Sequence, residues 1–291
     1  MNGKKSQSAM EYLMTYGWAI LIIAVVLGVL FQLGVFSGSA LTPKAAPGSC
    51  QLVRFGGQVS LEGECQGQLP QYVLQTPDTT GAAYISSPTM LPTGSVVTIT
   101  AWFNPNPVQN LNSYNFIANY GSGCTANAIG LSMQDSSARG FLPQMATWCN
   151  DFNPSWGTAA TPDKWNFEAV SLNGQSVTLF MDGNVVTGTL SILPTIKLSQ
   201  LNIGADGSNV QGFNGMISNV QIYNKSLTVN EIDALYIEGI GGAPINLQSL
   251  VGWWPLNGNI NDYSGYNQNG QVYSTDGVAF NGTWQIGYTP P

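Results

Sequence analysis

The chain has 291 residues, of which 44% are hydrophobic and only 8% are charged, and it contains no histidine. The missing imidazole excludes a Ser-His-Asp triad, a Cys-His dyad and every histidine-ligated metal site. Fifteen acidic and eight basic residues give a net charge of −7, which argues against a nucleic-acid partner because such a partner requires a basic surface. The classes that remain are secreted, membrane and surface proteins.

The N-terminal segment is predicted to be a membrane-spanning helix. No charged residue occurs between Glu11 and Lys44, and residues 18–36 are almost entirely apolar. About 20 such residues in a helix match the roughly 30 Å hydrocarbon core of a bilayer. Lys4 and Lys5 precede this run, so the positive-inside rule predicts a single pass, with the N-terminus in the cytoplasm and the bulk of the chain outside. A secretory signal peptide is the alternative, although its apolar region would be shorter.

The sequence KKSQSAMEYLMTYGWAIL, residues 4–21, resembles the class III signal of archaeal type IV pilins and related surface proteins. In that family a prepilin peptidase cuts ahead of the apolar helix, which implies cleavage between Ser6 and Gln7 and places Glu11 at mature position five. The resemblance implies self-assembly through the helix, with Glu11 paired to the amino terminus of a neighbouring subunit, because an unpaired carboxylate at the edge of hydrocarbon is costly. In the alternative, Glu11 snorkels to the headgroups of an ordinary anchor.

The four cysteines predict two disulfides in an exported domain. Cys50, Cys65, Cys124 and Cys149 all follow the apolar helix, and none belongs to a C-x-x-C pair. Without histidine a zinc site fits poorly, while an even count outside the cytoplasm favours disulfides. Of the three possible connectivities we expect Cys50–Cys65 and Cys124–Cys149, because residues 50–65 read as two strands around a Gly-Gly turn that brings their ends together. Free buried thiols are the alternative.

Short β-rich segments with turn signals between them follow a Pro/Gly/Ser-rich linker at residues 38–49. Several alternate polar and apolar residues, as half-buried antiparallel strands do. The predicted strands are Val96–Phe103, Trp165–Leu172, Ser176–Met181, Leu201–Ile203 and Met216–Tyr223. Many short strands indicate an all-β antiparallel sandwich or jelly roll.

Two local motifs refine this prediction. Asp182-Gly183 is typical of a tight hairpin turn. One helix outside the membrane segment is expected in SLTVNEIDALY, where Ser226 or Thr228 can cap the N-terminus and Glu231 follows Thr228 by three positions.

The segments ITAWFNPN, DKWNFEAVSLNGQSVTLFMDGNVV and LNIGADGSNVQGFNGMISNVQIYNKSLTVNEIDALY resemble the laminin G-like or concanavalin A-like jelly rolls, over about residues 72–282. In one departure, VGWWPLNGNINDYSGYNQNG resembles the opening of such a domain but lies near the C-terminal end. We therefore expect a permuted sandwich in which Val251–Leu256 and Gln271–Phe280 supply strands to the same fold. The predicted organisation is a leader at 1–6, a pilin-like helix at 7–37, a linker at 38–49, a disulfide-bonded hairpin at 50–71 and the sandwich at 72–291.

Calcium is the metal that this sequence would favour, and relatives of the fold often carry one. The available polar side chains are carboxylates and amides, which are ligands for a hard cation. Loops that hold Asp78 or Asp206 could complete such a site. The candidate ligands are Asp262, Asn257, Asn261 and Asn269. The alternative is an Asx-rich turn whose side chains bind their own backbone.

The resemblance implies a glycan or surface-protein ligand, since binding of glycans is a usual role of this fold outside cells. Exposed aromatic rings would form the platform for sugar rings. We expect Trp148, Trp156 and Tyr120 to supply it from the long loop region around Cys124 and Cys149, because loops on a rigid scaffold commonly carry function.

Catalysis is not expected. Glycosidases use paired carboxylates, and the E-x-D-x-x-E kind of strand motif is missing: Glu168 stands alone on its predicted strand, with Asp163 in a turn five positions earlier. Asn224 and Asn281 begin N-glycosylation patterns.

The combined prediction is a cell-surface binding protein, a pilin-like subunit or adhesin that displays a glycan- or protein-binding domain. A monomeric membrane-anchored lectin is the first alternative, and an extracellular carbohydrate-active enzyme is the second.

Overall fold

The structure, a computed structural model, describes residues 5–32, 50–63, 65, 69–76, 81–85, 88–109, 114–121, 126–134, 141–147, 149–154, 157–205, 212–274 and 284–286. The chain forms two compact units, Met1–Lys44 and Ala45–Pro291. Each is described by itself.

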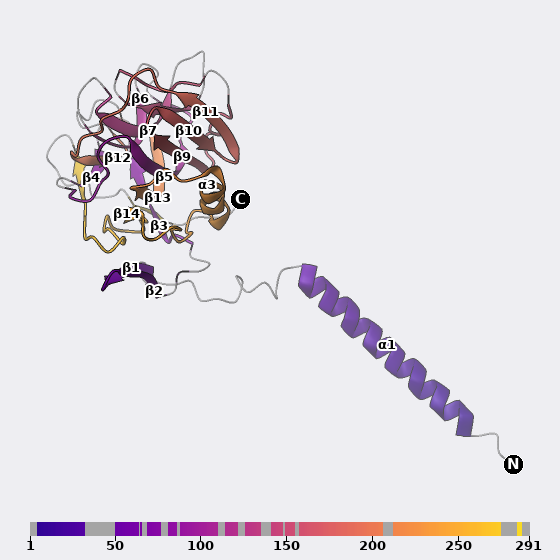
Figure 1. Cartoon of the computed structure of the whole chain (residues 1–291). Helices are drawn as coiled ribbons and strands as arrows, with labels where there is room; N and C mark the ends of the chain where they lie inside the picture. The colour runs from indigo at the N-terminus through magenta and orange to yellow at the C-terminus, as the bar shows by residue number, and fades with distance from the viewer. Residues whose placement is uncertain are drawn as a thin grey trace. The chain divides into compact units, whose positions relative to one another are not determined.

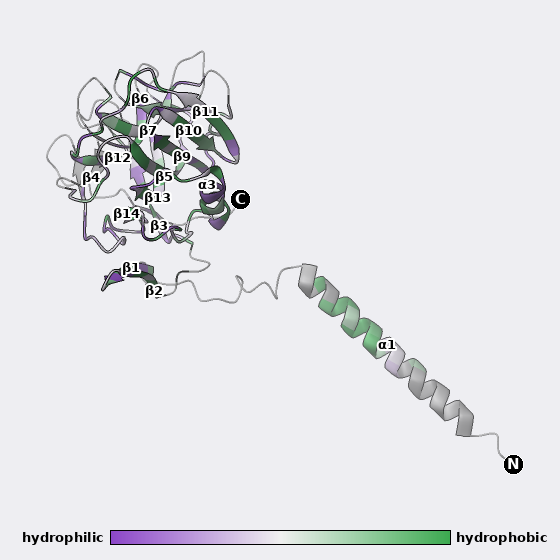
Figure 2. Cartoon of the chain, in the orientation of Figure 1, coloured by the Kyte–Doolittle hydropathy of each residue, from purple (hydrophilic) through white to green (hydrophobic). Residues whose placement is uncertain are grey.

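The first unit contains helix α1, Lys5–Gln32, which has 28 residues (Figure 1). Its described large apolar side chains, from Met14 to Val29, are 49–69% exposed, and Figure 2 shows the hydrophobic stretch that they form. Among the described residues, no helix meets the length and hydropathy that crossing a bilayer requires. Ser6, Gln7 and Glu11 lie in α1, but their side chains fall outside the described part of the chain.

The second unit is an antiparallel sandwich of two sheets, which confirms the predicted all-β sandwich (Figure 1). In the described part of the chain, the first sheet has eight strands: β11 (Asn184–Thr189), β10 (Ser176–Met181), β9 (Asn166–Asn173), β5 (Val96–Pro105), β13 (Gly215–Tyr223), β3 (Tyr72–Thr76) and β16 (Trp284–Ile286) in this order, with β14 (Leu250–Trp254) also paired to β13. The second sheet has six: β15 (Gln271–Ser274), β4 (Gly81–Ile85), β12 (Leu201–Ile203), β6 (Tyr114–Gly121), β7 (Ala128–Gln134) and β8 (Leu142–Ala146).

Strands from the C-terminal part of the chain join both sheets, as the sequence predicted. β14 pairs with β13 from Val220 to Tyr223, next to the shorter pairing of β3 with residues 215–217 of the same strand. β15 pairs with β4 in the other sheet. One edge of β13 therefore serves two short strands that are far apart in sequence.

Strand alternation places the core between the sheets. Val97, Ile99 and Ala101 of β5 face inward together with Val170 of β9, while Leu131 faces them from β7 in the other sheet. The intervening residues on each strand point away from this core because successive side chains alternate between the faces of a sheet. The two outward faces therefore need separate descriptions.

The outward face of the eight-stranded sheet is covered by helix α3, Val229–Glu238. Trp102, Phe167 and Phe180 form an aromatic cluster there, and Tyr236 of α3 stacks on Trp102 with ring centroids 5.8 Å apart. The helix begins with the predicted capping box, in which Thr228 and Glu231 each bind the other's backbone N–H.

A hairpin of β1 (Cys50–Phe55) and β2 (Gln58–Gly63) packs against the same side. Cys50 and Cys65 form the predicted disulfide. Cys149 is also disulfide-bonded, while its expected partner Cys124 lies outside the described residues.

Candidate functional site

The outward face of the six-stranded sheet is polar, unlike its counterpart. By alternation with the core residues, six side chains point outward from its central strands; we call this set the polar face, and it consists of Tyr114, Phe116, Asn119, Ser132, Gln144 and Asn202. The sequences of all six strands contain no charged residue. Phe116, Asn119, Ser132, Gln144 and Asn202 are 0–5% exposed and Tyr114 is partly buried, so only the edge of this face is accessible. Amides, a hydroxyl and aromatic rings allow hydrogen bonding there without net charge.

A row of amides crosses two strands of the polar face. Gln200 Nε2 donates to Asn202 Oδ1 at 2.6 Å, and Asn202 Nδ2 donates to Asn119 Oδ1 at 3.1 Å. Asn119 Nδ2 donates in turn to the carbonyl of Ala205 at 3.3 Å. Because Asn119 and Asn202 are buried and linked in series, their orientations are fixed.

A tyrosine–carboxylate pair lies at the β8 side of the polar face. Tyr114 Oη donates to Asp151 Oδ2 at 3.0 Å, and the Thr147 N–H donates to Asp151 Oδ1 at 2.8 Å. Burial and the charge of Asp151 raise the pKa of Tyr114 above its ordinary value of 10.0, so the phenol stays protonated and donates at neutral pH. The buried Thr147 hydroxyl has no hydrogen-bond partner among the described residues.

Small residues let aromatic rings lie close to this face. A Cβ on Gly130 would be 2.8 Å from Asn119 Cβ and 3.0 Å from Phe116 Cε1. The Tyr114 and Phe116 rings are 5.8 Å apart between centroids. Glycine at position 130 therefore makes room for the amide row and the rings side by side.

The predicted aromatic platform requires a correction. Tyr120 is fully buried, faces the core, and donates from its hydroxyl to the carbonyl of Pro92 at 2.9 Å. Its assignment to an exposed binding platform is therefore wrong. The structure does not describe Trp148 and Trp156, which lie outside the described ranges.

The predicted calcium ligands make hydrogen bonds to the backbone. Asp262 Oδ1 accepts from the N–H groups of Trp253 at 3.1 Å and Ser264 at 2.8 Å, and Oδ2 accepts from Gln268 N at 2.9 Å. Asn269 Oδ1 accepts from the Asp262 N–H at 2.9 Å. These contacts are those of an Asx-rich turn, the alternative that the sequence left open.

The other two candidates do not add a ligand cluster. Asn257 Oδ1 accepts from the Tyr72 N–H at 2.8 Å, and Asn261 is exposed. No group of three Asp, Glu, Cys or His side chains that could hold a metal occurs among the described residues. Calcium binding stays a prediction.

Asn224 is exposed immediately after β13, as a glycosylation acceptor would need to be, whereas Asn281 lies outside the described residues.

Glu168 faces the core between the sheets, with no exposure and no hydrogen-bond partner for its carboxyl oxygens within the described part of the chain. Burial, and secondarily the charge of Asp182, raise the pKa of Glu168 well above its ordinary value. In this position the carboxyl group cannot reach a substrate outside the sandwich.

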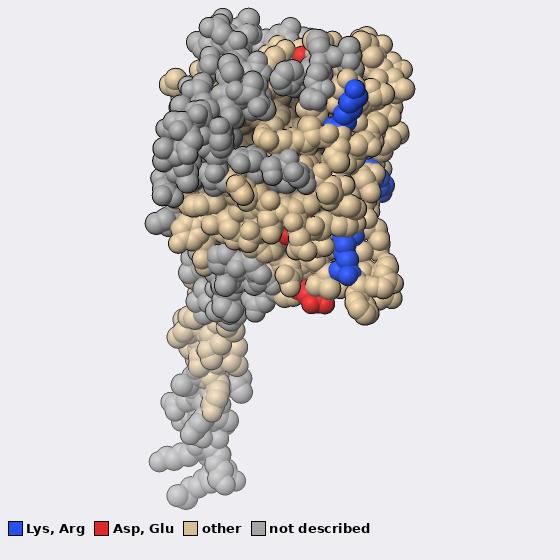
Figure 3. Space-filling view, turned by 90° about the vertical axis from the view of Figure 1, so that its left-hand side faces the viewer, with Lys and Arg blue, Asp and Glu red and all other residues tan. Residues whose placement is uncertain are grey.

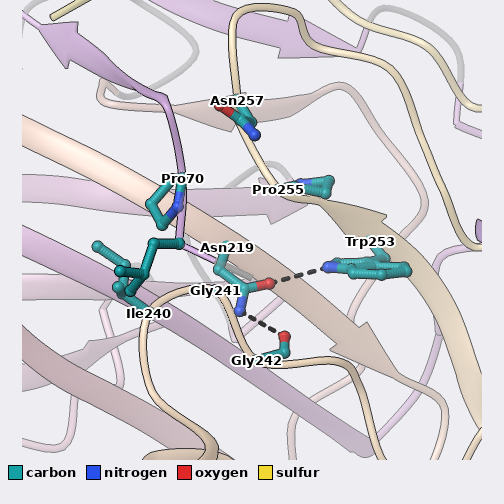
Figure 4. Close-up of a pocket in the computed structure, with 9 residues that line it drawn as sticks. Pro70, Asn219, Ile240, Gly241, Gly242, Trp253, Pro255 and Asn257 are labelled. Atoms are coloured by element: carbon teal, nitrogen blue, oxygen red, sulfur yellow. Dashed lines mark hydrogen bonds between the residues drawn. The ribbon is translucent and has the colours of Figure 1, made fainter. Parts of the chain in front are cut away.

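A small pocket opens on the covered side of the eight-stranded sheet (Figure 4). At its floor Trp253 Nε1 donates to Asn219 Oδ1 at 2.8 Å, and Asn219 Nδ2 donates to the carbonyl of Gly242 at 3.0 Å. Gln221 Nε2 also donates to Asn219 Oδ1. The Asn219 amide thus holds the segment after α3 against β13.

A family model described as the concanavalin A-like lectin/glucanases superfamily matches residues 77–233. The chain belongs to this superfamily. No curated protein matches it. The matched segment extends from just before β4 into α3, so it includes the whole polar face.

Solved structures with TM-scores of 0.50 or more share the fold of the sandwich at low sequence identity. A protein from Bacteroides ovatus described as carbohydrate-binding is 14% identical with a TM-score of 0.53, over 80% of this chain and 65% of that one. The extracellular region of zebrafish Gpr126/Adgrg6 is 13% identical with a TM-score of 0.50, over 79% of this chain and 28% of that one. The CBM40 of a Ruminococcus gnavus IT-sialidase, bound to α2,3-sialyllactose, is 17% identical with a TM-score of 0.44, over 57% and 97% of the two chains. The chain thus spans less than two thirds of the first and second of these structures.

Sequence reasoning missed the polar-face residues. The segment NFIANY in β6 has Asn119 two positions from Ile117, but a β-bulge between Phe116 and Ala118 shifts the alternation. A simple period of two therefore assigns the outward side chains of this strand wrongly.

Proposed function

We propose that this chain is a cell-surface protein whose sandwich binds neutral glycans at the accessible edge of the polar face, where Tyr114 and Asp151 are only partly buried. The observation that carries the proposal is the amide row beside the Tyr114–Asp151 pair, on a sheet without any other charge. Sugar hydroxyls are recognised by oriented amides and carboxylates, and an aromatic ring covers the apolar side of a sugar. The carbohydrate-binding description of the Bacteroides ovatus protein, which has the same fold, supports this choice.

The charge pattern argues for neutral sugars over acidic ones. Asp151 is the charged side chain that accepts a hydrogen bond from Tyr114 of the polar face. A carboxylate-bearing sugar next to Asp151 would be repelled, and the net charge of −7 adds to this repulsion at long range. In Figure 3 few charged residues lie on the described part of the visible face.

A glycan array with the full-length chain in detergent tests the proposal. Neutral glycans are expected to bind, and Asp151→Asn is expected to weaken their binding by roughly tenfold or more, the effect of one charge-assisted hydrogen bond. Asp163→Asn, at an exposed carboxylate in a turn, is the matched control and should bind as the wild type does. Binding that is unchanged in Asp151→Asn, or absent for every neutral glycan, would contradict the proposal.

Two additions address the remaining predictions about the site. Repeating the array with calcium and with a chelator tests the cofactor, and a hydrolysis assay on each bound glycan tests the enzyme alternative. We propose binding without hydrolysis, because the carboxyl group of Glu168 lies in the core. Trp148→Ala and Trp156→Ala extend the test to the loop platform.

We further propose that α1 attaches the protein to the cell surface, as a membrane anchor that also assembles in the manner of a pilin. Its exposed apolar side chains require cover by lipid or by neighbouring helices. The charge-free run after Glu11 and the class III signal-like start support processing by a prepilin peptidase between Ser6 and Gln7.

Mass spectrometry of the mature protein tests the processing. A mature N-terminus at Gln7 is expected, whereas one at Met1 or beyond residue 37 would contradict pilin-type assembly. Electron microscopy of shed material then separates filaments from a monomeric anchored lectin.

A further inference from the structure

The second unit, called the body below, begins with a hairpin whose two ends are joined by a disulfide. Cys50 is the first residue of β1, and Cys65 lies just beyond the end of β2. The disulfide joins residues that are 15 positions apart and brings their Cα atoms to 4.8 Å. The shortest covalent path from the N-terminal segment to β3 therefore passes through the two sulfur atoms and leaves the hairpin aside.

The hairpin is held on the body by one arginine and a few backbone groups. Arg54 Nε donates to the carbonyl of Ser264 at 2.9 Å, and its Nη2 donates to the carbonyls of Leu250 at 2.5 Å and Leu247 at 3.3 Å. The guanidinium carbon also lies 4.0 Å from the centre of the Tyr266 ring. The Leu250 carbonyl belongs to the first residue of β14, and the other two belong to the segments on either side of that strand, so Arg54 connects the start of the body to its C-terminal part.

Apolar packing supports the same attachment. Leu52 is buried in the outer cluster that contains Trp253 and Leu250, and Val59 and Leu61 pack against this cluster from β2. The Leu52 N–H also donates to the carbonyl of Tyr263 at 2.9 Å. All these contacts are non-covalent, and each would break in turn if β1 were pulled away from its end at Cys50.

We infer that the disulfide-closed hairpin is a tension-bearing junction, in which force that enters through the N-terminal segment crosses from Cys50 to Cys65 and leaves the docked hairpin unloaded. The inference rests on the proposed function, since a ligand held by the sandwich and an anchored α1 would stretch the chain between them. Without the bridge the same force acts on Leu52 and Arg54, and the hairpin peels from the body before the sandwich opens.

The extra extension that the chain gains when the Cys50–Cys65 bridge is absent can be calculated. Fifteen residues extend to about 50–54 Å at 3.3–3.6 Å each. Subtracting the 4.8 Å between the bridged Cα atoms leaves a gain of about 45–50 Å. This step is large enough to be resolved when a single molecule is stretched.

The test stretches the full-length chain in detergent between handles at its two ends in optical tweezers. The double variant Cys50→Ser/Cys65→Ser is expected to show an early extension of about 45–50 Å that the wild type lacks, before the main unfolding event. Adding Arg54→Ala to the double variant should lower the force of the early step. In the wild-type background, Arg54→Ala should leave the total length unchanged, because the bridge still sets it.

Equal lengths in wild type and double variant would overturn the inference. If the double variant lacks the main unfolding event and is therefore not folded, the folded wild-type chain is reduced in the instrument with a dithiol. The dithiol opens the Cys50–Cys65 bridge and the disulfide of Cys149 to thiols while it closes to its own disulfide, and the hairpin bridge is identified by the 15-residue size of its step before the main unfolding event. A step of the 15-residue size confirms the inference, and its absence contradicts it. Loss of glycan binding on the array would defeat the proposed function without changing this step.

Discussion

The two outward faces of the sandwich are built from the same kind of alternating strand, but they have opposite surroundings. On the eight-stranded sheet, Trp102, Phe167 and Phe180 are covered by α3 and the hairpin. On the six-stranded sheet, the corresponding positions carry the amide row and the Tyr114–Asp151 pair. The difference indicates that the first face contributes to stability through apolar packing, whereas the second holds polar side chains, and we propose that its edge at Tyr114 and Asp151 contributes to recognition.

The largest expected effect comes from truncating an aromatic side chain on the covered face of the eight-stranded sheet. Phe180 is fully buried and contacts both Phe167 and Tyr236, with ring centroids 5.8 Å apart in each pair. Phe180→Ala should lower the free energy of unfolding by about 3–5 kcal/mol, through lost transfer energy and a cavity. Chemical denaturation measures this change.

Two control variants sharpen that comparison. Phe55→Ala, at a hairpin-turn side chain that is 85% exposed, should be nearly neutral. Tyr114→Phe on the polar face should lower stability by only about 0.5–1.5 kcal/mol, the contribution of one hydrogen bond. A loss for Tyr114→Phe as large as that for Phe180→Ala would contradict the division of roles between the faces.

The next largest effect concerns Glu168, which is buried in the core between the two sheets. The folded-state pKa of Glu168 is raised by burial, so ionisation of its carboxyl favours the unfolded chain. The wild type should be most stable relative to Glu168→Gln below the ordinary pKa of 4.5, and should lose this advantage as the pH rises toward the raised folded-state value. Denaturation curves of both proteins between pH 4 and pH 9 measure the difference. A constant difference across this range would contradict the buried, protonated carboxyl group.

The smallest expected effect concerns the N-terminal end of α3, the helix that covers the eight-stranded sheet. The Lys225 ammonium and the Thr228 N–H lower the pKa of Glu231 to about 2. Glu231→Gln should lower stability by about 0.5 kcal/mol near neutral pH, because exposure screens the ion pair. The contribution should persist above the ordinary pKa of 4.5 and disappear as the pH falls toward about 2. Lys225→Gln is the paired control, since it removes the ion pair and keeps the capping box. An effect of Glu231→Gln that persists undiminished at pH 2 would contradict an ionic contribution.

Local sequence determined much of the fold. Alternation gave β10 and β12 with their observed ends, Asp182-Gly183 forms the predicted turn with positive φ at both residues, and Thr228 with Glu231 caps α3. Each of these features depends on neighbours within a few residues, which a sequence pattern records directly. The Cys50–Cys65 bridge was predictable for the same reason, because a short hairpin brings its own ends together.

Only the tertiary structure decided which residues form the candidate site. The bulge in β6 turned Tyr120 into the core, and the packing of strands from three parts of the chain placed Asn202 beside Asn119 and Asp151 beside Tyr114. It also brought Arg54 to carbonyls nearly 200 positions later in the chain. The physical reason is that a local pattern specifies whether a strand forms and how its side chains alternate, whereas register, bulges and long-range pairing specify which face those side chains reach and which groups they meet there.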